Sequence, residues 1–98
     1  MKFEVFIFPE AKQDLKLAAV WYDKQQKGLG KKFLSCVRQS KKVLRSNPHF
    51  VKRHGNIHTL PLRQFPFMIH FLINQDKMTV IVLAVLHTSQ SPERWPKG

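Results

Sequence analysis

The chain has 98 residues, 43% of them hydrophobic, which is enough for one compact core but too few for two independent domains. Seventeen Lys and Arg against six Asp and Glu give a formal charge of +11 at pH 7, which favours a partner of negative charge. The apolar runs are far shorter than the ~20 residues of a membrane-spanning helix, and the single cysteine, Cys36, excludes an internal disulfide. We therefore expect one cytoplasmic domain over residues 1–98, with 92–98 as a loosely held tail.

The first elements are predicted from alternation and from helical spacing. Alternating apolar residues predict a strand over Lys2–Phe8, with Phe3, Val5 and Ile7 on one side. Pro9 suits the first turn of a helix that runs to about Gln26, and two carboxylates near its start, Glu10 and Asp14, complement the helix dipole. The side of this helix that faces the core should carry Leu15, Ala18, Ala19, Tyr22 and Trp21.

A second, strongly amphipathic helix follows Gly28-Leu29-Gly30, because glycine accepts the backbone geometry of a helix terminus. The helix ends at Asn47-Pro48. Its predicted apolar face comprises Phe33, Cys36, Val37, Ser40, Val43 and Leu44. Much of the other face is cationic, through Lys31, Lys32, Arg38, Lys41, Lys42 and Arg45. So short a connection predicts an αα-hairpin.

The second half of the chain reads as three strands after a basic connection, Val51–Gly55. The strands are expected at Ile57–Arg63, Phe67–Ile73 and Met78–His87, and the turn-forming Asn74–Lys77 should close the last two into an antiparallel hairpin. The last two strands are apolar on both faces and should be central. These elements predict an α+β fold: an N-terminal strand, an αα-hairpin and a three-stranded antiparallel meander, in one antiparallel sheet packed by the helices on one face.

Basic residues in the second half suggest a site that cleaves RNA. That reaction needs a proton acceptor, a proton donor and positive charge at the scissile phosphate, which histidine and arginine can supply. If the strands pair as expected, Arg63 and His87 lie at strand ends and could meet. Further candidates for binding phosphate are Lys52, Arg53, His54 and His58. The alternative interpretation is that these residues form a solvated basic loop and polar strand ends.

Three other features have plainer interpretations. His70 lies in a central strand, where a buried, hydrogen-bonded histidine is the ordinary case. The cationic face of the second helix contacts phosphates or an acidic partner, or is simply solvated. The five histidines lack the spacing of a metal site, so neither a metal nor a cofactor is expected.

The order of several short motifs resembles the RelE/ParE superfamily of toxins from type II toxin–antitoxin and plasmid-stabilisation modules. The resemblance spans nearly the whole chain. Its motifs are Pro9-Glu10-Ala11 with Asp14-Leu15, Trp21-Tyr22, Gly28-Leu29-Gly30 with Phe33, Asn47-Pro48, Arg63 with Phe65-Pro66-Phe67, and Leu83-Ala84-Val85-Leu86-His87 with Pro92 and Trp95.

This resemblance implies a toxin that arrests growth and is silenced by an antitoxin, whose C-terminal segment wraps it. RelE-like members cut messenger RNA on the ribosome and ParE-like members poison DNA gyrase. In the RNA-cleaving branch, Arg63 and His87 match catalytic or phosphate-binding positions. The chain departs from many relatives at Gln90, where they have arginine, although Arg94 or Lys97 could replace the charge. Gln90 and Arg94 are therefore further candidates for contacting RNA phosphates.

We therefore expect a metal-independent endoribonuclease acting at the ribosome. The alternatives are a non-enzymatic gyrase inhibitor and an inactive relative that still binds the antitoxin.

Overall fold

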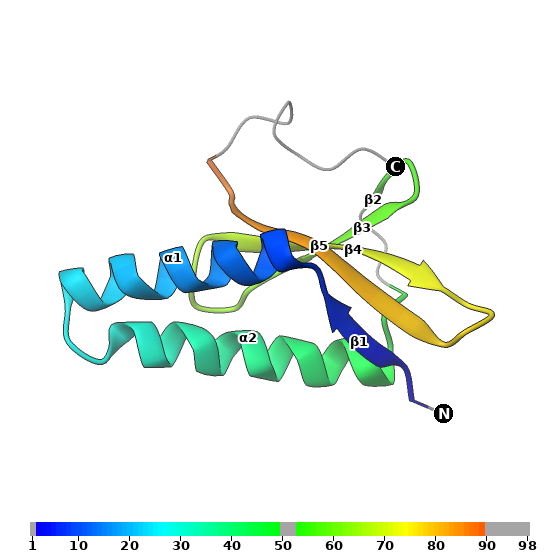
Figure 1. Ribbon diagram of the computed structural model, residues 1–98, viewed down its shortest axis with the longest axis horizontal. Helices are drawn as coiled ribbons and strands as arrows, with labels where there is room; N and C mark the ends of the chain where they lie inside the picture. The colour runs from blue at the N-terminus through cyan, green and yellow to red at the C-terminus, as the bar shows by residue number, and fades with distance from the viewer. Residues whose placement is uncertain (1, 50–52, 90–98) are drawn as a thin grey trace.

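The computed structural model describes residues 2–49 and 53–89, with the backbone alone at 53 and 54 (Figure 1). The tail expected at 92–98 lies outside these residues. The first half contains strand β1 (Glu4–Ile7) and helices α1 (Pro9–Gln25) and α2 (Leu29–Ser46). The second half contains strands β2 (Arg53–His54), β3 (Ile57–Pro61), β4 (Phe67–Asn74) and β5 (Thr79–His87).

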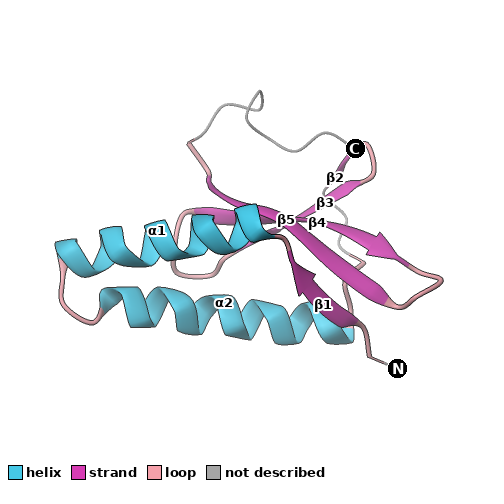
Figure 2. Ribbon diagram, viewed as in Figure 1, coloured by secondary structure: helices cyan, strands magenta, loops and turns pink. Residues whose placement is uncertain are grey.

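The strands form one five-stranded sheet in the order β1-β5-β4-β3-β2, and both helices lie on one side of it (Figure 2). The α+β class, the helical hairpin, the antiparallel meander β3-β4-β5 and the central places of β4 and β5 are confirmed. The expectation of a wholly antiparallel sheet is wrong, because β1 runs parallel to β5 with Glu4 opposite Thr79 and Ile7 opposite Val82. A parallel pair needs a long crossover, which the helices and the meander supply.

Two differences from the predicted strands, at β2 and at the end of β3, bear on the candidate site residues. The basic connection at 51–55 contains β2, which pairs with the start of β3 across a turn where Gly55 has a φ of 63°. Strand β3 stops at Pro61 instead of Arg63, and Leu62 donates its N–H to the Phe67 carbonyl at 2.9 Å as the chain turns back. Arg63 therefore lies in the β3–β4 loop and not in a strand.

The connection between the helices depends on two glycines. Gly28 has a φ of 88°, a left-handed geometry that other residues rarely adopt. Gly30 lies where α2 approaches α1, and a Cβ there would collide with the Ala19 carbonyl oxygen and lie 2.8 Å from the Asp23 carboxylate. That carboxylate accepts the Gly30 backbone N–H at 2.7 Å, so Asp23 also holds the first turn of α2.

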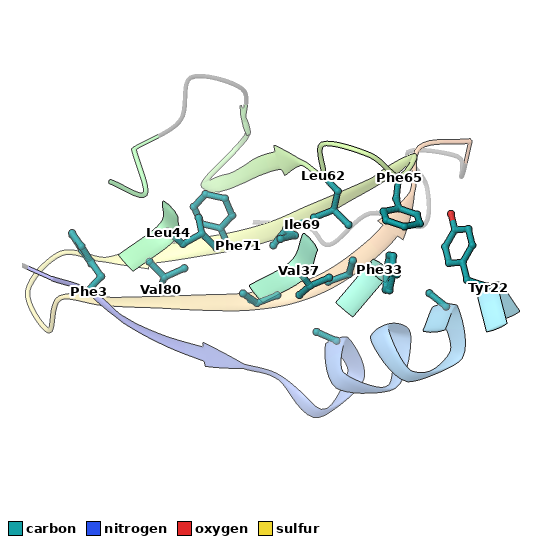
Figure 3. Close-up of a cluster of buried hydrophobic side chains, with 14 residues drawn as sticks. Phe3, Tyr22, Phe33, Val37, Leu44, Leu62, Phe65, Ile69, Phe71 and Val80 are labelled. Atoms are coloured by element: carbon teal, nitrogen blue, oxygen red, sulfur yellow. The ribbon is translucent and has the colours of Figure 1, made fainter. Parts of the chain in front are cut away.

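The core lies between the helices and the sheet, and aromatic rings fill one end of it (Figure 3). The Phe33 ring lies 5.4 Å from Tyr22, 5.3 Å from Phe65 and 5.2 Å from Phe67, measured between ring centroids. Phe33 is fully buried. Residues from both helices and from the β3–β4 region thus share one aromatic cluster, which fixes the hairpin on the sheet.

Three residues assigned to the core from helical spacing lie differently. Trp21 is 57% exposed and Val43 is 45% exposed, so both predictions of burial are wrong, and Cys36 is only partly buried. These side chains sit at the margins of their helices' apolar stripes, where they border surface pockets. Within the described part of the chain, neither helix is long and apolar enough to cross a membrane.

Candidate functional site

The direction of His87 is set by an irregularity in β5. His70 pairs with Ala84 and Phe71 with Val82, so Leu83 is an extra residue, a β-bulge. Val82 and Val85 both belong to the core although three positions separate them, which shows that the alternation shifts here. The shift turns His87 toward the helices, where its ring lies 5.2 Å from the Phe67 ring.

The His87 ring is held by the residues that follow β5. The Ser89 backbone N–H donates to its Nδ1 at 3.0 Å, and the Ser89 Oγ lies 2.7 Å from the same nitrogen. A nitrogen that accepts an N–H carries no hydrogen, so the neutral ring has its proton on Nε2. In this tautomer Nε2 is the hydrogen-bond donor of the ring.

His87 lies at a groove of about 730 Å³ between α1 and the end of β5. Leu17 and Trp21 of α1 line one side, and both are more than half exposed. Pro66 and Phe67 line the other side. The groove therefore joins a largely apolar surface to a single histidine.

The groove also borders the exposed edge of β5. Strand β1 pairs with β5 only as far as Val82, and among the described residues no strand continues along that edge to His87. Asp14 of α1 covers part of it, because its Oδ2 accepts the Val85 backbone N–H at 3.1 Å. The rest of the edge runs along the groove.

Asp14 is a site residue that the sequence did not reveal. The sequence predicts a partner of the helix dipole and a motif shared with the family, yet the carboxylate bonds to a strand 71 positions away. Burial raises the pKa of Asp14 above the ordinary 3.8, the bond from Val85 opposes that rise, and Glu10 adds to it. Burial likewise raises the pKa of Tyr22, which lines the same groove.

Arg63 lies at a different place. It lines a pocket between α2 and the β3–β4 loop, together with Lys32 and Gln64, and Gln64 accepts a hydrogen bond from the Cys36 thiol at 3.6 Å. This pocket and the groove at His87 have no lining residue in common. The structure therefore does not bring Arg63 and His87 to one pocket.

The remaining histidines of the meander differ in setting. His58 is partly buried, stacks on Phe71 with ring centroids 5.5 Å apart, and lines a third, polar pocket at the far end of β4. His70 is completely buried, as the sequence predicted for a central strand. Neither shares a pocket with Arg63 or His87.

The structure describes the other predicted phosphate-binding residues only in part. Arg53 and His54 form β2, with Arg53 opposite His58 in the register, and their side chains are not described. Lys52, Gln90 and Arg94 lie outside the described residues. Among the residues that are described, no three His, Cys, Asp or Glu side chains are grouped so as to hold a metal ion.

Comparison with known structures identifies the fold. A chain of the chromosomal ParDE toxin–antitoxin system from P. aeruginosa superposes with a TM-score of 0.75 at 16% identity, covering 89% of this chain and 97% of that one. The RelBE2 toxin–antitoxin complex of Mycobacterium tuberculosis gives 0.61 at 17% identity, covering 89% and 99%. A mutant of the E. coli toxin RelE in the free state gives 0.61 at 11% identity, covering 95% and 90%. At these identities the likeness shows the fold, which is that of type II toxins.

The family is defined by the sequence. Residues 5–92 match the family described as the ParE toxin of the type II toxin–antitoxin system parDE, and the chain belongs to it. Among curated proteins, none matches the sequence. The chain is thus a toxin of the type II toxin–antitoxin class.

Proposed function

We propose that this toxin arrests growth by binding DNA gyrase and not by cleaving messenger RNA. The observation that carries the proposal is that Arg63 and His87 line different pockets, one beside α2 and the other beside α1. Membership of the ParE family supports it too, because the ParE-like branch of the superfamily inhibits gyrase.

The separation matters because RNA cleavage needs its groups at one phosphate. A proton acceptor, a proton donor and a cation must all lie within hydrogen-bond reach of the reacting atoms, roughly 3 Å. A toxin that acts by binding needs no such convergence.

The ribosome-dependent endoribonuclease is the second candidate, and it has an observation in its favour. Arg63 is exposed, His87 is partly exposed, and the chain carries a charge of +11. In that case Lys52, Arg53, His54, His58, Gln90 and Arg94 would supply further contacts to RNA, and the ribosome would assemble the reacting groups around the message.

The experiment compares the wild-type chain with Arg63→Ala/His87→Ala after induced expression. Under our proposal both proteins stop growth, both inhibit gyrase supercoiling, and messages stay intact. Codon-phased cuts on ribosomes that disappear in the variant would overturn it in favour of the nuclease. A folded wild-type chain that leaves growth unaffected would indicate an inactive relative.

We also propose where the antitoxin binds: its C-terminal segment occupies the groove between α1 and β5. Leu17 and Trp21 offer apolar contact, and the β5 edge offers backbone hydrogen bonds to an extended peptide.

Leu17→Glu/Trp21→Glu should keep toxicity but escape neutralisation by the antitoxin. Phe6→Glu, an exposed apolar residue on β1, is the matched control and should still be neutralised. Equal neutralisation of both variants would mean that the antitoxin binds at another surface.

A further inference from the structure

The outer face of α2 carries four cations in a nearly straight line. Successive helical residues rotate by about 100°, so Lys31, Arg38, Lys42 and Arg45 fall within an arc of about 60°, opposite the buried Phe33, Val37 and Leu44. All four cations are exposed. At about 1.5 Å per residue the line is about 21 Å long.

Nearby carboxylates do little to neutralise this line. Helix α2 contains six Lys and Arg and no Asp or Glu. On the adjacent α1, the three carboxylates are already matched by three Lys, so that helix carries no net formal charge. Among the described residues the line is therefore a concentrated positive surface on a rigid element.

The residues between the cations help to identify the ligand. A protein partner would be expected to meet an apolar or aromatic centre, and single-stranded nucleic acid would need rings on which bases stack. The exposed side chains beside the line are Ser35, Gln39 and Ser46, and the one apolar residue at its other margin, Leu34, is partly buried. Point charges without apolar contacts match the phosphates of a duplex, which are contacted one by one.

We propose that Lys31, Arg38, Lys42 and Arg45 bind the phosphate backbone of double-stranded DNA without reading its sequence. The B-form major groove is about 12 Å wide and admits one side of an α-helix, whereas the major groove of an RNA duplex is too narrow. Phosphates that border the groove would lie within reach of the four side chains. This contact is separate from target recognition and does not depend on which target the toxin has.

The test measures binding of the full chain to a fluorescent 24-base-pair DNA over a range of salt concentrations. Each neutralised phosphate contributes about −0.9 to the slope of log K against log salt, so four contacts give a slope of roughly −3.6. In Arg38→Gln/Lys42→Gln/Arg45→Gln the slope should fall to roughly −1, and affinity at 0.1 M salt should drop by at least about 10-fold.

The matched control removes the same charge from the other helix. Lys12→Gln/Lys16→Gln/Lys24→Gln changes three exposed cations of α1 and should bind DNA within about 3-fold of the wild type, because screening weakens charges away from the contact. Equal losses in the two triple variants would overturn the proposal, since net charge alone would then explain binding. Circular dichroism shows whether both variants are folded.

Two competitor ligands test the identity of the partner. Polyglutamate should compete weakly, and an RNA duplex of the same sequence should bind less tightly than DNA. Polyglutamate that displaces DNA at an equal concentration of charges would identify an acidic protein as the partner and overturn the proposal. Tighter binding to the RNA duplex would overturn it in favour of RNA.

Discussion

Helices α1 and α2 pack on the same sheet but present different surfaces to solvent. Helix α1 has three Lys and three carboxylates, so its formal charge cancels, and it exposes Leu17, Val20 and Trp21. Helix α2 has six cations and no carboxylate, and the one large apolar residue it exposes is Val43. Two neighbouring elements of one hairpin thus offer an apolar surface and a cationic surface.

The difference shows how a small chain can accommodate two kinds of partner. An apolar groove beside a free strand edge suits a peptide, and a line of cations suits phosphates. Because the two surfaces share the core but not the exposed residues, changes on one should leave the other intact, and only changes in the core should affect both.

The largest expected effect comes from Phe33→Ala, which should damage both surfaces together. Phe33 is fully buried among aromatic rings from both halves of the chain, so its loss should lower the free energy of unfolding by about 3–5 kcal/mol. Urea unfolding measures the change. Phe6→Ala, at a position that is 53% exposed, should cost less than about 1 kcal/mol; similar losses would contradict the assigned core.

Gly30→Ala should separate the two helices at their closest point. The added Cβ meets the Ala19 carbonyl oxygen and the Asp23 carboxylate, so we expect a loss of about 1–3 kcal/mol in the free energy of unfolding. Ser35→Ala, an exposed position on α2, is the control and should stay within about 0.5 kcal/mol of the wild type. An unchanged unfolding midpoint for Gly30→Ala would mean that the helices lie farther apart.

Asp14→Ala should act on the α1 side alone. It leaves the partly buried Val85 N–H without its acceptor, at a cost of about 1–2 kcal/mol in the free energy of unfolding, whereas DNA binding by α2 should not change. Asp14→Asn keeps an acceptor oxygen and should cost less. If Asp14→Asn were as damaging as Asp14→Ala, the hydrogen bond would not be the reason for the loss.

The same residue gives the smallest and most specific effect, a dependence on pH. Because the pKa of Asp14 is raised in the folded state, the part of its stability contribution that is linked to protonation is fully present below the ordinary 3.8 and is lost as the pH rises through the raised value. Stability relative to Asp14→Asn should therefore decline from low pH toward neutral pH. Unfolding curves of the two proteins measured at several pH values give this difference, and a difference that rises with pH would contradict it.

The helices and the core were largely predictable from the sequence, because a buried stripe such as Phe33, Val37 and Leu44 leaves a clear period of 3.6 residues. The width of a stripe was not predictable. Trp21 and Val43 lie at its margins, and whether a margin is covered depends on how far the sheet extends beneath the helix.

The candidate site was less predictable than the fold. The side of the sheet that His87 faces depends on a bulge, and β5 is apolar on both faces, so its sequence shows no shift in alternation. Arg63 was misplaced because Pro61 ends the strand early. Asp14 was missed because its partner is a backbone group, which has no signature in the sequence.

The bulge at Leu83 also decides how this chain can be compared with distant relatives. Deleting Leu83 would leave a regular strand with Val82, Val85 and His87 still on the side of the helices, whereas an insertion or deletion elsewhere between Val80 and His87 would turn the residues beyond it over. A functional residue of a relative can therefore be assigned to this strand by counting positions only when both chains have the extra residue. An alignment gap at Leu83 leaves the residues beyond it on the same face of the sheet. A gap two residues away moves those residues from the groove to the opposite face.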